Sequence, residues 1–169
     1  LQFEVDGSVL IPRPETEELV EWIAADMPHA KRILDVCTGS GCIALALARR
    51  IAQSDVCGID ISTDALAIAR RNAERYAPRV KFLMADALAD FSAVAGDGFD
   101  VIVSNPPYIP EADRAAMRPN VTRYEPDMAL FVPDVEAAFY VGVVIVCLVG
   151  NGGVESKPVG LLSPCGMCL

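Results

Sequence analysis

Hydrophobic and polar residues alternate along the middle of the chain in short blocks that predict strands and helices in turn. Four apolar runs have the length of buried strands: residues 32–36, 56–61, 80–84 and 100–104. Residues 42–52 and the segment from Ser62 to Tyr76 have the composition and spacing of helices, and Ser62, Thr63 and Asp64 can cap the second one. Strands that alternate with helices of about 10 to 15 residues imply right-handed crossovers and a parallel sheet. We therefore predict an α/β fold with a doubly wound sheet.

The first 28 residues follow a different pattern. Asp-Gly at positions 6–7 lies between short apolar runs, which predicts a small hairpin over residues 3–11. Pro-Arg-Pro at 12–14 then stiffens the chain. Residues 15–27 carry apolar side chains at helical spacing and acidic residues in the first turn, so a helix is expected there.

Composition and charge exclude several classes of protein. Hydrophobic residues make up 53% of the 169 residues, too many for intrinsic disorder. The net charge of −9 argues against a basic surface for nucleic acid. We expect neither a membrane span nor an export signal, because no apolar run reaches about 18 to 20 residues and the N-terminus has no basic start. The six cysteines are then expected to be reduced thiols in the cytoplasm. Cys165-Gly-Met-Cys168 has no second ligand pair, so no metal site is predicted.

The segment Asp35-Val-Cys-Thr-Gly-Ser-Gly41 lies directly between a predicted strand and a predicted helix. Its glycines allow a tight turn and a close approach of backbone to ligand, and the helix offers free N–H groups. This favours a nucleotide-like ligand at the carboxyl end of the first strand. The sequence is neither G-x-G-x-x-G nor a P-loop, so a diphosphate site is poorly supported. A structural turn is the alternative interpretation.

Two further carboxylates follow predicted strands. Asp60 ends the second strand about 20 residues beyond the glycines, where a carboxylate can accept hydrogen bonds from ribose hydroxyls. Its alternative role is to help begin the next helix. Asp86 follows the third strand and could meet an adenine amino group, or could simply be a solvated strand end. Both readings stay open for each residue.

The segment Ser104-Asn105-Pro106-Pro107-Tyr108 follows the fourth strand. Two successive prolines fix the backbone and remove two N–H donors. What remains is a row of acceptors, the Asn105 side-chain oxygen and nearby carbonyls, beside the aromatic wall of Tyr108. Such a site suits a planar substrate that carries an NH2 group, although a simple Asn-Pro turn is the alternative.

Four segments in order carry a resemblance to a known family. They are Val9-Leu-Ile-Pro-Arg-Pro-Glu-Thr-Glu17, Ile33-Leu-Asp-Val-Cys-Thr-Gly-Ser-Gly-Cys-Ile-Ala-Leu45, Asn105-Pro-Pro-Tyr-Ile-Pro110, and Tyr124-Glu-Pro126 with Ala129-Leu130. Together they resemble the HemK/PrmC family of class I S-adenosylmethionine-dependent methyltransferases, which modify the glutamine N5 of peptide chain release factors. The resemblance extends over about residues 3–140 and implies a Rossmann-like doubly wound sheet.

The resemblance implies a cofactor, a partner and the residues that hold them. S-adenosylmethionine would be the cofactor, and a release factor would be the protein substrate, with no direct nucleic-acid binding. Around the methionine part of the cofactor would lie Cys37, Thr38, Gly39, Ser40 and Gly41, with Asp35 beneath them. Asp60 would bind the ribose, and Asp86 and Ala87 would border the adenine.

The substrate glutamine would be held by the segment after the fourth strand. Its side-chain amide would lie against Asn105, Pro106, Pro107 and Tyr108, and Asn105 would touch the cofactor as well. Residues 13–15 would close over the cofactor from outside. These roles imply methyl transfer in translation termination.

The chain departs from the family pattern at both ends. We expect residues 1–28 to be the hairpin and first helix, left from a linker to an absent N-terminal helical domain. Residues 29–150 would be the methyltransferase core, and 151–169 an atypical tail that replaces the last strands. By β-branched content residues 141–149 are a strand, whereas by family position they are a helix, and both possibilities stay open.

Two other functions compete with glutamine methylation. Asn-Pro-Pro-Tyr also occurs in adenine-N6 and guanine-N2 nucleic-acid methyltransferases, against which the net charge of −9 argues. Alternatively, the chain is a non-catalytic remnant that still binds the cofactor. Salt-sensitive binding to RNA or DNA would favour the first, and cofactor binding without methyl transfer the second.

Overall fold

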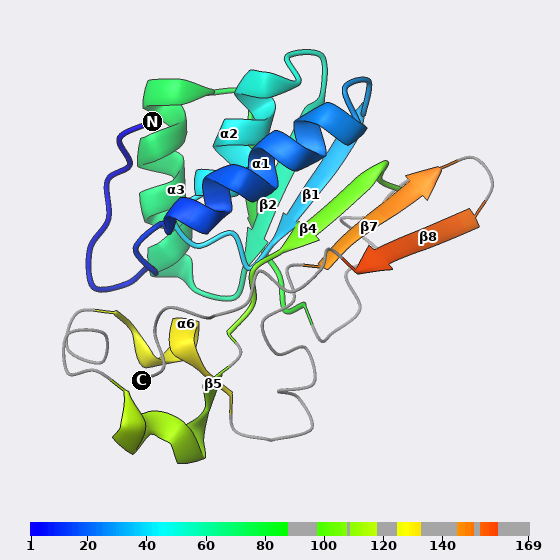
Figure 1. Ribbon diagram of the computed structural model, residues 1–169. Coiled ribbons are helices and arrows are strands. Elements are labelled where there is room, and N and C mark those ends of the chain that lie inside the picture. Colours follow the sequence, from blue (N-terminus) through cyan, green and yellow to red (C-terminus); the bar gives the residue numbers. More distant parts are fainter. Residues whose placement is uncertain (88–97, 108, 118–124, 133–144, 151–152, 159–169) are drawn as a thin grey trace.

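A six-stranded sheet forms the centre of the molecule, with strand order β3-β2-β1-β4-β7-β8 (Figure 1). The computed structural model describes residues 1–87, 98–107, 109–117, 125–132, 145–150 and 153–158. The strands are β1 (Arg32–Val36), β2 (Asp55–Asp60), β3 (Lys81–Met84), β4 (Val101–Ser104), β7 (Ile145–Gly150) and β8 (Gly153–Pro158). Strands β3, β2, β1 and β4 are parallel, whereas β7 and β8 pair antiparallel. The predicted α/β fold is therefore confirmed, and two antiparallel strands extend its sheet.

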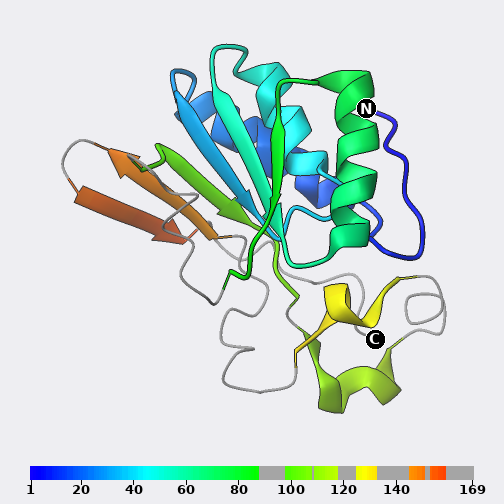
Figure 2. The same ribbon diagram turned by 180° about the vertical axis from the view of Figure 1, so that it is seen from behind.

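Three helices cover one face of this sheet, as the two opposite views show (Figures 1 and 2). They are α1 (Pro14–Asp26), α2 (Cys42–Arg50) and α3 (Thr63–Tyr76). Each helix begins and ends within two residues of the limits predicted from the sequence. The predicted cap of α3 is also confirmed, because Ser62 Oγ accepts a hydrogen bond from Ala65 N at 3.2 Å.

The apolar runs of the strands are explained by burial on both faces of the sheet. Ile33, Val56 and Val101 pack in one core cluster with residues of the three helices. Leu34 and Ile59, their alternating neighbours, lie in a second cluster and are fully buried. A strand buried on both faces has a nearly continuous apolar sequence, which is why these strands could be predicted.

The predicted hairpin at residues 3–11 is wrong. The turn exists, since Val9 N donates to the Asp6 carbonyl at 3.3 Å, but no strands flank it. Each arm instead packs on α3. Val9 is buried in a cluster with two α3 residues, and the Phe3 ring meets the Tyr76 ring edge to face. The N-terminal segment, residues 1–13, thus runs along a helix because its apolar side chains find partners there (Figure 1).

Beyond β4, the described residues form a small unit at the carboxyl edge of the sheet, seen below the strands in Figure 1. It contains β5 (Ile109–Pro110), the 3-10 helix η1 (Glu111–Ala116), α6 (Asp127–Leu130) and β6 (Phe131–Val132). Arg114 joins two of these elements, donating to Glu111 in η1 and to Asp127 in α6.

The open question about the apolar run at 141–149 is answered for its second half. Residues 145–150 form strand β7, antiparallel to β4. The β-branched composition therefore predicted this part correctly, and the family position did not. Residues 159–169, which include most of the predicted tail, lie outside the described residues.

Candidate functional site

The order of the strands places a topological switch point at the carboxyl ends of β1 and β4. From β1 the chain builds β2 and β3 on one side, whereas β4 lies on the other, so the winding reverses between β1 and β4. Open α/β sheets bind ligands at such a switch point. Val36 is level with Ile59 of β2 and with Ser104 of β4, so the connections that leave these strands begin side by side.

The structure brings most of the predicted site residues to this edge. After β1 come Cys37, Thr38, Gly39, Ser40 and Gly41, which we call the glycine-rich loop. Asp60 ends β2, Asp86 and Ala87 follow β3, and Asn105, Pro106 and Pro107 follow β4. Tyr108 lies outside the described residues.

The glycine-rich loop turns through three residues with left-handed backbone, Cys37 (φ 58°), Gly39 (φ 54°) and Gly41 (φ 79°). A Cβ atom on Gly41 would lie 3.0 Å from Cζ of Phe82 and 3.2 Å from Cβ of Ala69, so the loop is in tight contact with β3 and α3 there. A Cβ atom on Gly39 would meet nothing within 4 Å. The loop is therefore packed on the protein at Gly41 and open at Gly39.

The side chain of Asp35 holds the glycine-rich loop in place through hydrogen bonds. It is fully buried, and its Oδ2 accepts hydrogen bonds from Thr38 Oγ1 at 2.6 Å and from the Ala44 backbone N–H at 3.1 Å. Its other oxygen, Oδ1, is buried without a hydrogen-bond partner. Burial, opposed by these two bonds, raises the pKa of the Asp35 carboxyl to about 7. One carboxyl group thus joins the end of β1, the loop and the first turn of α2.

Asp60 connects the loop to the next helix. Its Oδ2 accepts from Gly39 N at 2.9 Å, and its Oδ1 accepts from Ser62 N at 2.9 Å. The alternative role predicted for Asp60, to help begin α3, is therefore present in the structure. Asp60 is half-buried, while Asp86 is exposed.

The Cys37 thiol is not a candidate nucleophile. Burial, together with the nearby carboxyl groups of Asp60 and Asp35, raises its pKa to about 11. The thiolate is the reactive form of cysteine, and such a pKa keeps this side chain protonated near neutral pH. Chemistry at this edge must therefore rely on binding and orientation rather than on covalent attack by Cys37.

The segment after β4 begins from a fixed point. Ser104 Oγ donates to the Val36 carbonyl at 2.9 Å, which ties the ends of β4 and β1 together. Asn105, Pro106 and Pro107 follow at once and are half-buried. Because neither proline has an N–H, the backbone at these two positions can only accept hydrogen bonds.

Two interactions at the site were not predicted from the sequence. Asn72 in α3 donates to the Ser40 carbonyl at 3.0 Å and is almost fully buried. The sequence feature that could have indicated Asn72 is its position as a polar residue in the apolar stripe of α3, between Ala69 and Ala73. Arg13 Nη2 donates to Glu125 Oε1 at 2.6 Å, which joins the N-terminal segment to the unit beyond β4. No local pattern indicates a pair that is 112 residues apart.

Comparison with known proteins decides the family. A family model described as "Methyltransferase domain" matches residues 33–124, which hold the glycine-rich loop, Asp60 and the Asn-Pro-Pro segment. The chain belongs to this methyltransferase domain family. Within the described residues, no helix of this domain is both long and apolar enough to cross a membrane.

The resemblance to release factor glutamine methyltransferases is also confirmed. The domain is 49% identical over 134 residues to the "Release factor glutamine methyltransferase" of Bacteroides thetaiotaomicron, covering 78% of this chain and 47% of that protein. It is 51% identical over 142 residues to the protein of the same name from Chlorobaculum tepidum, covering 78% and 48%. The chain thus spans about half the length of the curated relatives it matches.

Solved structures confirm the fold of the methyltransferase domain. The catalytic domain of hMettl16 in complex with a MAT2A 3'UTR hairpin superposes with a TM-score of 0.55 at 19% identity, covering 68% of this chain and 42% of that one. The N-terminal domain of human METTL16 in complex with SAH gives 0.51 at 18%, covering 64% and 47%. At this identity the likeness concerns the fold alone.

Proposed function

We propose that this domain transfers a methyl group from S-adenosylmethionine to the side-chain amide nitrogen of the glutamine in the Gly-Gly-Gln motif of peptide chain release factors, in the cytoplasm. The observation that carries the proposal is the position of the glycine-rich loop beside the Asn105-Pro106-Pro107 strip, level with each other at the switch point. The relatives named release factor glutamine methyltransferase, at 49% and 51% identity, support this substrate over other amino compounds.

The residues at the switch point fit the cofactor. Gly39 leaves one side of the glycine-rich loop open, so a ligand can approach the backbone there. Asp60, half-buried beside Gly39, would accept from the ribose hydroxyls, and Asp86 and Ala87 would border the adenine. Thr38 and Ser40 are held in place from below, the first by Asp35 and the second by Asn72. When bound, S-adenosylmethionine supplies an electrophilic methyl group on a sulfonium.

The strip after β4 would orient the substrate amide. An amide nitrogen is a poor nucleophile because its lone pair is delocalised into the carbonyl. The Asn105 side-chain oxygen and the Pro106 carbonyl would accept the two amide hydrogens and aim the nitrogen at the methyl group. The N–C bond would form as the S–C bond breaks, with S-adenosylhomocysteine as the leaving group, and one of the two amide hydrogens would be lost to solvent as a proton. Orientation of this kind contributes about 7 to 11 kcal/mol in favourable cases. The protonated Cys37 thiol takes no part in this step.

Charge argues against nucleic acid as the substrate. The chain has 14 basic and 23 acidic residues, and nucleic-acid affinity depends largely on Lys and Arg that face phosphates. A protein substrate needs no such surface.

Calorimetric titration with S-adenosylhomocysteine tests the cofactor half of the proposal. We expect one-to-one binding that Asp60→Ala weakens at least tenfold, because the carboxylate holds both Gly39 and the ribose. Asp64→Asn, an exposed carboxylate in the first turn of α3, is the matched control and should bind as the unaltered chain does. Equal binding by Asp60→Ala and the control would contradict the assignment of Asp60.

Methyl transfer tests the substrate half. The chain is incubated with a release factor and S-adenosylmethionine labelled in the methyl group, and the modified peptide is identified by mass spectrometry. We expect label on the glutamine of Gly-Gly-Gln, and Asn105→Ala should abolish it while cofactor binding persists. No label from a cofactor-bound chain would instead support the non-catalytic remnant.

A further inference from the structure

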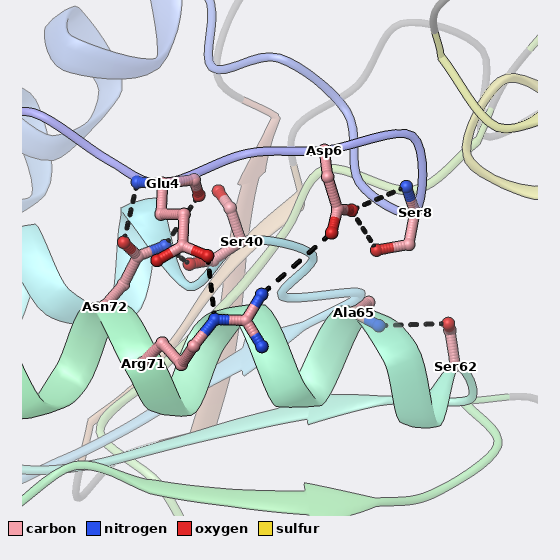
Figure 3. A network of polar contacts seen from close by, with 8 residues as sticks. All are labelled: Glu4, Asp6, Ser8, Ser40, Ser62, Ala65, Arg71 and Asn72. Carbon is pink, nitrogen blue, oxygen red and sulfur yellow. Dashed lines mark hydrogen bonds and ion pairs between the residues drawn. The ribbon is translucent and has the colours of Figure 1, made fainter.

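The side-chain amide of Asn72 lies at the centre of a polar network between the N-terminal segment and α3 (Figure 3). Its Oδ1 accepts from the backbone N–H of Glu4 at 2.8 Å, and its Nδ2 donates to the Glu4 carbonyl at 3.0 Å. The same Nδ2 donates to the Ser40 carbonyl at 3.0 Å. Both hydrogens of the amide are thus used, one on the N-terminal segment and one on the glycine-rich loop.

The contact with Glu4 imitates the pairing of two strands. The Asn72 amide meets the N–H and the C=O of a single residue, as the C=O and N–H of one residue in a neighbouring antiparallel strand would. In the absence of the predicted hairpin, the backbone N–H and C=O of Glu4 find their partners here. The segment in turn covers Asn72, which is only 2% exposed.

The contact with Ser40 sets the direction of the glycine-rich loop. A hydrogen bond from Asn72 points the Ser40 carbonyl toward α3, and this orients the peptide group that joins Ser40 to Gly41. Gly41 N in turn donates to the Thr38 carbonyl at 2.9 Å, closing the turn. The loop therefore rests on three separate polar supports, of which Asp35 and Asp60 belong to the sheet and Asn72 to α3.

We propose that Asn72 is a positioning residue for the glycine-rich loop, and that it makes cofactor affinity depend on whether the N-terminal segment is docked on α3. This inference rests on the proposed function. When residues 1–6 leave α3, the Asn72 amide loses two of its three hydrogen bonds and becomes accessible to water. The amide can then rotate, and the Ser40 carbonyl loses the donor that holds it.

Besides the contact of the Phe3 ring with Tyr76, the remaining contacts of residues 1–6 with α3 lie at the surface. Arg71 donates to Glu4 Oε1 at 2.8 Å and lies 4.0 Å from Asp6 Oδ2, but all three side chains are about half exposed. Gln2 N donates to the Tyr76 hydroxyl at the surface. Exposed ion pairs contribute little to stability. The fraction of molecules in which residues 1–6 are docked on α3 is therefore sensitive to any other contact that these residues make.

A double-mutant cycle on the full chain tests the coupling. One variant is Asn72→Asp, which keeps the size and an acceptor for Glu4 N but places an oxygen where Nδ2 donates. The other deletes residues 1–6, of which only Phe3 packs against the core, and it provides a separate test if Asn72→Asp fails to fold. Arg71→Gln, which touches the N-terminal segment but not the loop, is the control. Affinity for S-adenosylhomocysteine is measured by calorimetry, and amide exchange of residues 37–44 by mass spectrometry.

We expect each change alone to weaken binding about tenfold, and the double variant to bind no more weakly than Asn72→Asp, because both act through one hydrogen bond. Amide exchange should accelerate at residues 37–44 and stay unchanged in β1 and β2. Arg71→Gln should change affinity less than about threefold.

Three results would overturn the inference. The first is unchanged affinity in the deletion variant. The second is a double variant weakened about a hundredfold, which would mean independent effects. The third is faster exchange throughout the sheet, the sign of general destabilisation. A full chain that binds no S-adenosylhomocysteine would defeat the proposed function instead, and the exchange at residues 37–44 would still decide whether Asn72 holds the loop.

Discussion

Replacing Asp35 with asparagine should change how the stability of the protein depends on pH. The Asp35 carboxyl is fully buried, and its pKa is raised to about 7, mainly by loss of hydration. In the unfolded chain the pKa returns to the ordinary value of 3.8. Between these two values the folded protein holds a proton that the unfolded chain releases. Asparagine has the same shape, can still accept from Thr38 and Ala44, and does not titrate.

The sign and the size of the effect follow from proton linkage. A raised carboxyl pKa contributes stability that is complete below about pH 4 and is lost as the pH rises through about 7. Each pH unit in that interval corresponds to about 1.4 kcal/mol. Between pH 5 and pH 8 the unaltered protein should therefore lose about 2 to 3 kcal/mol relative to Asp35→Asn. Every other titrating group is shared by the two proteins and cancels in the difference.

Urea unfolding of both proteins at pH 5, 6, 7 and 8, followed by circular dichroism, measures this difference. We expect the free energy of unfolding of Asp35→Asn to rise relative to that of the unaltered protein up to about pH 7, and then to level off. Parallel curves across the whole range would refute the reasoning. They would mean that Asp35 is charged at pH 5 in the folded state and is solvated in a way that its burial does not indicate.

Further predictions concern the loop and the N-terminal segment. Gly41→Ala should lower the free energy of unfolding by about 1 to 3 kcal/mol, seen in urea unfolding, because its methyl group meets Phe82 with a left-handed backbone. Gly39→Ala should cost only about 1 to 2 kcal/mol of strain, yet weaken S-adenosylhomocysteine binding in calorimetry, because its methyl group enters the open side of the loop. Arg13→Gln should destabilise by about 1 to 3 kcal/mol at pH 8 and by less at pH 5, where the buried Glu125 can take up a proton. A pH-independent loss in the same unfolding assay would contradict that account.

The parts of the fold and site that could be predicted are those written in consecutive residues. Buried strands have nearly continuous apolar runs, so the limits of β1 and β4 follow closely from composition. The glycine-rich loop could be predicted because its glycines follow directly after a strand, and both features are visible in consecutive residues. The position of Asp60 beside that loop could be predicted because the carboxyl ends of β1 and β2 are neighbours in a parallel sheet.

The parts that could not be predicted depend on contacts between distant residues. The hairpin failed because an Asp-Gly turn does not specify whether its arms pair with each other or with a helix. Asn72 joins residues 4 and 40, which no local period relates. The apolar run before residue 150 fits a helix or a strand, and only pairing with β4 distinguishes them.

The antiparallel pairing of β7 with β4 has a consequence for how such a protein can diversify. Ser104 and Ile145 face each other on one rung of the sheet, so the 40 residues between them leave and return at the same point. That stretch is a long connection whose two ends are fixed beside each other by the pairing of β4 with β7. Doubling the length of such a connection adds only about 0.6 kcal/mol to the entropic cost of closing it. Evolution can therefore lengthen the part that follows Asn-Pro-Pro without disturbing a single strand of the sheet, and a laboratory insertion there that keeps Glu125 beside Arg13 should be tolerated for the same reason.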